Sequence, residues 1–154
     1  MNFDYEKMVV SDLTRWNQMF GGGVPTKADI EAAMRGEVDP DTLQRMRSYT
    51  HSLERRTVVD ECFTVYPEEW SFEEFRALMG RLVASIPEDK RHTAKIELTG
   101  GYDESTYLRA SYERDQTDDE WASDVAHALM HARKGQADDL RIYNRLKAKF
   151  TADQ

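Results

Sequence analysis

The sequence contains a single cysteine, Cys62, among its 154 residues. One cysteine forms neither an intramolecular disulfide nor a cysteine-rich zinc cluster, so we expect Cys62 to be a small buried side chain in a reducing compartment. No uninterrupted apolar run approaches the roughly 20 residues that a membrane-spanning helix needs. The first residues also lack the basic and then apolar pattern of a secretion signal. We therefore expect a cytoplasmic protein that is not associated with a membrane.

Basic residues are outnumbered by acidic ones. Twenty-one lysines and arginines face 29 aspartates and glutamates, which gives a formal net charge of −8. This charge opposes direct binding to the phosphates of nucleic acids and favours a protein partner with a basic surface. The alternative interpretation is that the charge serves only to keep the chain soluble.

Catalytic motifs are also absent. The pairs His51-Ser52 and His92-Thr93 place a hydroxyl beside an imidazole, but neighbours in sequence rarely face each other productively. The glycines at 21–23 are not followed by the Lys-Ser/Thr pair of a phosphate-binding loop. We therefore predict a protein that is not an enzyme and uses no cofactor.

The first part of the chain has the apolar spacing of helices. Apolar residues recur at three- and four-residue steps over residues 4–20, and the glycines at 21–23 end that helix. Thr26 is predicted to cap a second helix that stops near Gly36, and Asp39-Pro40 begins a third. Residues 57–66 are rich in β-branched and aromatic types, and the pattern leaves open whether they extend this helix or form a strand.

The second part of the chain contains clearer signals. Ser71 and Glu74 form a capping box for a helix that ends before Pro87. Residues 94–98 and 108–113 alternate between apolar and charged types and predict a β-hairpin with an edge open to another strand. A second capping box begins the last helix near Asp118, and its apolar stripe, interrupted at Gly135, resumes through Leu140, Tyr143, Leu146 and Phe150. One kinked helix or two helices satisfy this pattern.

These patterns predict a mostly helical α+β fold. Residues 1–66 are expected to form an N-terminal helical segment. Residues 67–154 are expected to form an α-β-β-α unit with a β-hairpin and a long C-terminal helix. The two parts can also join in one compact domain. The last helix is longer than a small hairpin can cover, so its distal half is expected to pack on the N-terminal helices or on a second copy in a homo-oligomer.

One group of residues is a candidate metal site. Asp124, His127 and His131 lie at helical spacing on one face, and histidines four residues apart can share a zinc ion. A fourth ligand would have to come from elsewhere, such as His92 or Glu113. The alternative, which the sequence favours, is that both histidines are ordinary surface or interface residues, and our prediction includes no metal.

Three segments of the last third carry a resemblance. These are Ser111-Tyr112-Glu113-Arg114, Thr117-Asp118-Asp119-Glu120-Trp121 and Tyr143-Asn144-Arg145-Leu146-Lys147-Ala148-Lys149-Phe150. They resemble a strand end, helix start and helix end of uncharacterised small accessory proteins of tailed bacteriophages. The resemblance implies a phage gene product, and small acidic phage proteins without enzymatic motifs often inhibit a host or defence protein.

Acidic clusters and aromatic residues together suggest how such a protein would bind. Acidic rims around aromatic anchors suit docking on a basic protein surface. The residues predicted to contact the partner are Glu68, Glu69, Trp70, Glu73, Tyr102, Tyr107, Asp118 and Asp119. The leading hypothesis is a non-enzymatic, phage-encoded inhibitor, similar in role to anti-CRISPR proteins, of a bacterial defence or nucleic-acid-handling protein. The alternatives are a metal-binding protein or enzyme that uses His127 and His131, and a self-associating scaffold or a sponge for a nucleotide signal.

Overall fold

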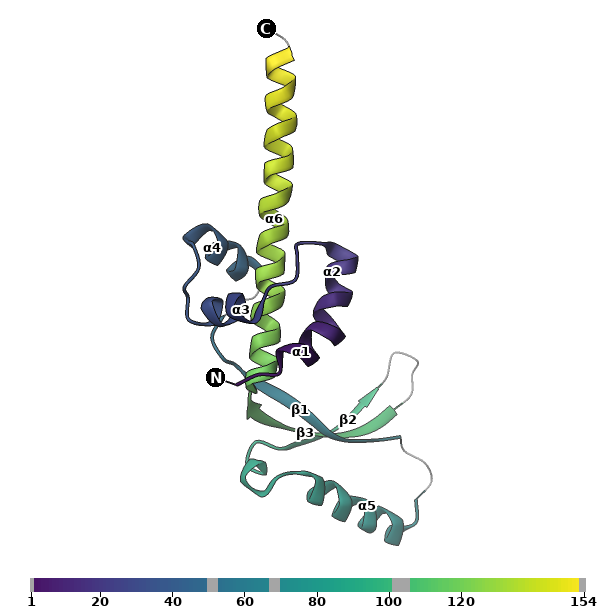
Figure 1. The fold of residues 1–154 in the computed structure, drawn as a ribbon. Helices are drawn as coiled ribbons and strands as arrows, with labels where there is room; N and C mark the ends of the chain where they lie inside the picture. Colours follow the sequence, from purple (N-terminus) through teal and green to yellow (C-terminus); the bar gives the residue numbers. More distant parts are fainter. Residues whose placement is uncertain (1, 50–52, 67–69, 101–105, 153–154) are drawn as a thin grey trace. The chain divides into compact units, whose positions relative to one another are not determined.

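The computed structural model describes residues 2–49, 53–66, 70–100 and 106–152 (Figure 1). The fold is α+β and mostly helical, with a small antiparallel sheet and a long C-terminal helix, as predicted. It forms two compact units, one of Met1–Arg55 with Thr117–Gln154 and the other of Arg56–Gln116. We call them the helical unit and the α/β unit. This division differs from the expected boundary between residues 66 and 67, because the last helix packs with the N-terminal helices.

The helical unit is built around one long helix. It contains α1 (Tyr5–Met8), the π-helical turn η1 (Val9–Leu13), α2 (Thr14–Phe20), α3 (Lys27–Met34), α4 (Pro40–Tyr49) and α6 (Asp118–Ala152). The expected helix over residues 4–20 is thus present with a π-helical turn inside it. Helix α6 is a single helix of 35 residues that continues through Gly135, which decides between the two arrangements that the sequence left open.

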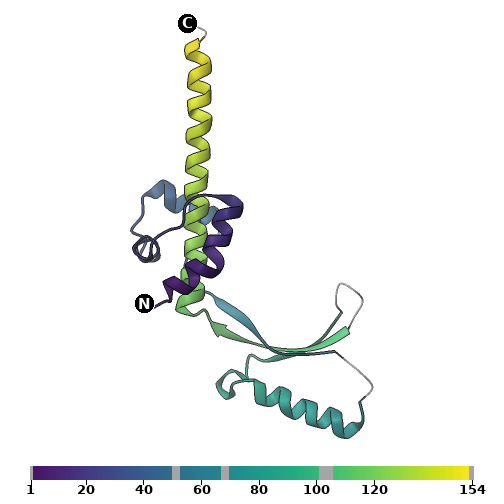
Figure 2. The same cartoon turned by 45° about the vertical axis from the view of Figure 1, so that its right-hand side comes forward.

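The core of the helical unit lies against the first half of α6. Helices α3 and α4 both contact α6, and Figures 1 and 2 show the short helices grouped around this half. Most of the buried α6 side chains are alanines, which allow neighbouring helices to approach closely. The buried apolar residues are Phe3, Met8, Leu13, Ile30, Ala33, Met46, Ala122, Val125, Ala126, Ala128, Leu129, Met130 and Ala132.

Gly22 allows the connection between α2 and α3 to cross close to α6. Its φ is 116°, in the region that favours glycine, and a Cβ at this position would lie 2.5 Å from the carbonyl oxygen of Met130. The three glycines therefore do more than end a helix: the middle one makes room for the backbone of α6.

The predicted capping boxes are present. The amide of Glu74 donates to Ser71 Oγ at 3.3 Å, and the Ser71 amide donates to Glu74 Oε2 at 2.7 Å. Thr117 and Glu120 form the same reciprocal pair at the start of α6. Thr26 caps α3 in the same way. Each box satisfies amides that the first helical turn leaves without partners.

The α/β unit contains a three-stranded antiparallel sheet and one longer helix. Its elements are β1 (Thr57–Val65), α5 (Phe72–Ser85), the 3₁₀ turn η2 (Glu88–Lys90), β2 (Lys95–Gly100) and β3 (Thr106–Asp115). The strand order is β1-β3-β2. Residues 57–65 are therefore a strand, and they supply the third strand for which the predicted hairpin had an open edge. The register of β1 on β3 shifts between Glu61 and Phe63.

Helix α5 covers one face of this sheet (Figure 1). Leu82 of α5 and Ile86, which directly follows the helix, are buried with Ala110 of β3, and Cys62 and Tyr112 pack against them. Cys62 is half-buried, in partial agreement with its predicted role as a buried residue. The last helix, α6, was expected to cover the hairpin together with α5. It belongs instead to the helical unit, so the hairpin is extended by β1 and covered by α5.

Candidate interaction surfaces

The residues predicted to bind a partner divide between the two units. Glu68, Glu69 and Tyr102 lie outside the described residues. Trp70, Glu73 and Tyr107 belong to the α/β unit, whereas Asp118 and Asp119 belong to the helical unit. The prediction therefore combines residues from both compact units of the chain.

The aromatic residues of the α/β unit have ring neighbours. The Trp70 ring centroid lies 6.1 Å from that of Phe75, in the hydrophobic-staple arrangement that the sequence predicts. Tyr107 lies 5.9 Å from Tyr66, centroid to centroid. Glu73 is exposed and forms an ion pair of 2.9 Å with Arg76 one turn later, a surface pair of small energetic value.

Asp118 and Asp119 hold the N-terminus of the chain to the start of α6. Asp118 Oδ2 accepts the amide of Asn2 at 2.9 Å, and Asp119 Oδ1 accepts the amide of Asp4 at 2.7 Å. Asp118 also forms an ion pair with Arg55. These contacts give both carboxylates a structural role in the helical unit.

Large apolar side chains are exposed on the α/β unit. Phe72 is 77% exposed and Leu98 is 70% exposed, and Phe75, Val83 and Ile96 are also exposed. The sequence predicts that the apolar stripe of α5 is buried. The structure buries this stripe at Leu78, Leu82 and the following Ile86, whereas Phe75 and Val83 of the same stripe are exposed. The two apolar residues of β2 lie on an outer strand of the sheet. Exposed apolar side chains of this kind are typical of surfaces that bind other molecules.

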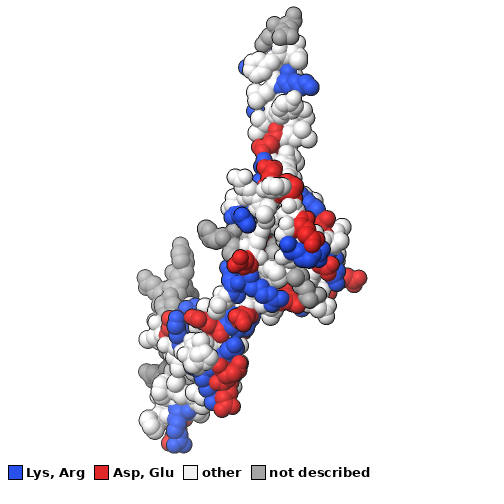
Figure 3. All heavy atoms as spheres, turned by 90° about the vertical axis from the view of Figure 1, so that its left-hand side faces the viewer, with Lys and Arg blue, Asp and Glu red and all other residues white. Residues whose placement is uncertain are grey.

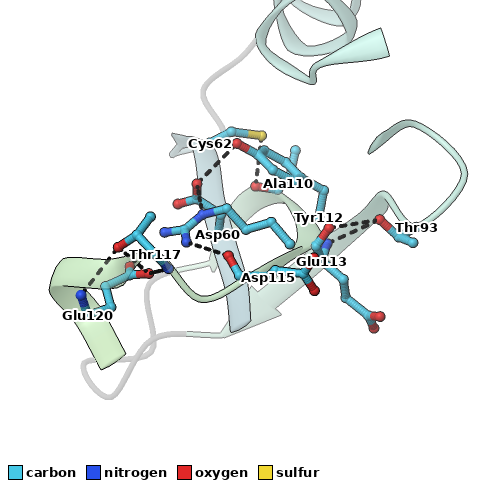
Figure 4. A network of polar contacts seen from close by, with 10 residues as sticks. Asp60, Cys62, Thr93, Ala110, Tyr112, Glu113, Asp115, Thr117 and Glu120 are labelled. Atoms are coloured by element: carbon cyan, nitrogen blue, oxygen red, sulfur yellow. Dashed lines mark hydrogen bonds and ion pairs between the residues drawn. The ribbon is translucent and has the colours of Figure 1, made fainter. Parts of the chain in front are cut away.

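A polar network connects β1 with β3 on the α5 side of the sheet (Figure 4). Asp60 Oδ2 accepts hydrogen bonds from the Tyr112 hydroxyl and from Arg114 Nε, both at 3.0 Å. The hydrogen bond to Asp60 raises the pKa of Tyr112, and burial raises it further. The network therefore keeps Tyr112 protonated and fixes the pairing of the two strands, with no feature of a nucleophile or general base.

The opposite face of the sheet carries a chain of charges. Arg109 of β3 contacts Glu61 of β1 at 2.7 Å and Glu97 of β2 at 2.9 Å. These carboxylates raise the pKa of Arg109. A hollow of about 200 Å³ lies on this face, and Lys95 and Glu113 are among its other lining residues. Because the charges alternate in sign and pair with each other, this face is suited to solvent.

The two histidines of the metal hypothesis stack on aromatic rings. His127 lies 5.8 Å from Trp16, and His131 lies 5.0 Å from Tyr49, centroid to centroid. Burial lowers the pKa of His127, and its Nε2 atom is buried with no hydrogen-bond partner among the described residues. Within the described ranges, no group of three or more His, Cys, Asp or Glu side chains converges as metal ligands do. The histidines thus serve as ring partners in the packing of α6.

A pocket of about 450 Å³ opens beside these rings. Its lining residues are Trp16, Tyr49, His131, Lys134, Gly135 and Asp138. The walls combine aromatic rings with one cation and one acid, without a nucleophile or a convergent set of donors.

The distal half of α6 is the most exposed apolar element of the helical unit. Every side chain from residue 139 to residue 151 is exposed, and in both ribbon views this part of α6 extends beyond α1–α4 (Figure 2). We call residues 140–151 the distal segment. Its large apolar side chains are Leu140, Ile142, Tyr143, Leu146 and Phe150, each between 44% and 65% exposed. Four of them, all except Ile142, were predicted from the sequence as a resumed apolar stripe, and the structure leaves this stripe uncovered.

The distal segment is also basic. It contains four lysines and arginines and no acidic residue, and Figure 3 shows blue without red at this end of α6. The two acids that precede it are engaged nearby, Asp138 with Arg141 and Asp139 with Arg45. This run of basic residues was not predicted as a functional feature, because the net charge of −8 is dominated by acidic residues elsewhere in the chain.

Comparisons of this chain with protein-family models, with curated proteins and with solved structures gave no match. Among the described helices, none combines the length and the apolar character needed to span a bilayer.

Proposed function

We propose that this chain is a non-enzymatic binding protein that attaches to a basic surface of a bacterial protein through its α/β unit. The observation that carries the proposal is the composition of that unit. It contains 13 acidic and eight basic residues, together with the exposed rings of Phe72, Phe75 and Tyr66. Exposed aromatic side chains supply most of the binding energy at protein interfaces, and complementary charge orients and accelerates the encounter.

The proposed mechanism is competition. A basic surface that normally holds nucleic-acid phosphates is attractive to an acidic protein of the right shape, and occupation of that surface blocks the nucleic acid without any chemical step. The resemblance of the last third to phage accessory proteins supports the proposal that the chain is a phage gene product. It likewise supports a defence or nucleic-acid-handling protein of the bacterial cytoplasm as the target. The polar networks of both units, which are structural in character, support a role without catalysis.

The test is affinity purification from a bacterial lysate followed by mass spectrometry. We expect capture of a basic protein, weakened by salt because the attraction between opposite charges is screened. Reversal of Glu68, Glu69 and Glu73 to lysine should reduce capture about tenfold or more, since each places a like charge against the basic partner.

The matched control makes the same change of net charge in the helical unit. Lysine substitutions at Glu6, Glu31 and Glu37 alter the total charge equally and should leave capture unchanged within about twofold. Equal loss with both triple variants would show attraction by net charge alone and would contradict a specific acidic surface. If the capture of every recovered protein is unaffected by the substitutions at Glu68, Glu69 and Glu73, the proposal is wrong.

A further inference from the structure

The apolar stripe of the distal segment continues the buried seam of the first half of α6. In the first half, Trp121, Val125, Ala128 and Ala132 follow one another at steps of four, three and four residues, and they pack in the core. The same steps lead through Gly135 and Asp139 to Ile142 and Leu146. A helix keeps one face in line at this spacing, so the exposed stripe points in the same direction from the helix axis as the buried seam.

The area of this stripe is sufficient for pairing with a second copy. At their exposures, the five large apolar side chains of the distal segment present roughly 600 Å² of surface. Complete burial of these side chains in two copies would remove at most about 1,200 Å² from water, which is the lower end of the range for specific protein interfaces. In an isologous pairing both copies use the same stripe, with Tyr143, Leu146 and Phe150 at its centre and Leu140 and Ile142 at its margins.

The charges of the distal segment lie mostly away from the stripe. At about 100° per residue, Arg141 and Arg145 point roughly 130–170° from the centre of the stripe between Tyr143 and Leu146. Lys147 and Lys149 flank it at about 70–90°, where their aliphatic stems can cover apolar surface while the ammonium groups remain in water. Self-association therefore buries none of the four basic residues of the distal segment, although these residues repel each other between the two copies. Asp139 lies on the same face just before the segment, opposite Phe150 of the other copy, and its ion pair with Arg45 compensates its charge there.

The helical unit itself determines the direction of pairing. In the first half of α6 the seam is occupied by α3 and α4 of the same chain. In a parallel pair, these helices from both copies would have to occupy the same space between the two α6 helices. In an antiparallel pair they lie at opposite ends, and only the distal segments overlap.

We propose that two copies of this chain form an antiparallel helix pair through residues 140–151. Tyr143 of one copy packs beside Leu146 of the other near the two-fold axis, and Phe150 reaches the end of the partner's stripe. The proposal is independent of the partner of the α/β unit. It gives the protein two identical α/β units for binding, which increases its avidity for a target with repeated sites.

Sedimentation velocity of the 154-residue chain over a range of concentrations tests the pairing. We expect a concentration-dependent dimer that becomes stronger with salt, since salt screens the repulsion between the basic segments. Leu146→Asp places a charge in the stripe and should weaken the dimer about 100-fold or more. Asn144→Asp adds the same charge on the opposite side of the helix and should leave the dimer intact.

The direction of pairing has its own readout. In a Cys62→Ser background, Phe150→Cys places a thiol on the stripe itself. The two thiols lie about 16 Å apart along the antiparallel pair, at 1.5 Å per residue, and oxidation should yield no crosslink, whereas in a parallel pair they would face each other. An efficient Phe150→Cys crosslink within the dimer would overturn the antiparallel arrangement. A wild-type chain that remains monomeric would overturn the pairing itself. So would a monomeric chain whose binding to phosphatidylserine vesicles is lost in Leu146→Asp, because the stripe would then contact lipid and not a second copy.

Discussion

Replacement of Gly22 by alanine tests the packing of the helical unit at its closest point. The added Cβ would lie 2.5 Å from the carbonyl oxygen of Met130 and 3.3 Å from its carbonyl carbon. Both atoms belong to the backbone of α6, which cannot rotate away as a flexible side chain can. Gly23 provides a matched control, because its φ of 82° is also positive but a Cβ there meets nothing within 4 Å.

The magnitude follows from two separate costs. A positive φ costs an alanine about 1–3 kcal/mol, and the loss of glycine's freedom in the unfolded chain returns about 0.4–1 kcal/mol. Both substitutions share these contributions. Gly22→Ala additionally forces the chain and α6 apart, which costs about 2–3 kcal/mol by comparison with overpacked cores. We therefore expect the free energy of unfolding of Gly22→Ala to be lower than that of Gly23→Ala by about 2–3 kcal/mol.

Urea unfolding gives the free energy, and hydrogen exchange locates the effect. Amides of α6 near Met130 should exchange faster in Gly22→Ala than in Gly23→Ala, whereas peptides from residues 56–116 should exchange alike in both. Equal stability of the two variants would refute the close approach of residue 22 to α6, and with it the account of why a glycine is needed there.

Three further predictions concern single side chains. Burial lowers the pKa of His127 below its ordinary value of 6.5, so the unfolded chain takes up a proton before the folded chain does as the pH falls. Stability should be complete above about pH 6.5 and decline below it, and His127→Gln, but not His92→Gln, should flatten this decline in urea unfolding measured from pH 7 to pH 5. Ser71→Ala removes the cap of α5 and should cost about 1 kcal/mol, seen as faster amide exchange in the first turn of α5; unchanged exchange would contradict the capping role. Trp121→Ala should cost about 3–5 kcal/mol, because the half-buried ring also donates from Nε1 to the carbonyl of Leu53 at 2.7 Å, and an unchanged melting curve would place the ring outside the packed structure.

The candidate surfaces show how far the sequence leads. Trp70 and Glu73 were predicted from local patterns, and the Trp70–Phe75 contact is present because the hydrophobic staple depends on residues only five apart. The sequence did not indicate that Asp118 and Asp119 would bind the amides of Asn2 and Asp4. Those contacts join residues more than 100 positions apart, and no local pattern specifies them.

The sequence by itself determined where helices begin. A capping box requires two side chains three residues apart, so Ser71 with Glu74 and Thr117 with Glu120 carry the whole of the necessary information. The alternation of the hairpin strands is equally local, because one face of a strand is set by every second residue. These features were predicted and are present in the structure.

Only the tertiary structure decided the remaining features. Residues 57–65 become a strand because β3 offers them an edge, and α6 passes through Gly135 unbroken while Arg45 contacts Asp139 alongside. Packing over long separations also joins α6 to the N-terminal helices and leaves residues 140–151 exposed. The physical reason is that apolar periodicity specifies which face of an element avoids water, whereas the choice of covering partner depends on which distant surfaces meet and how well they fit.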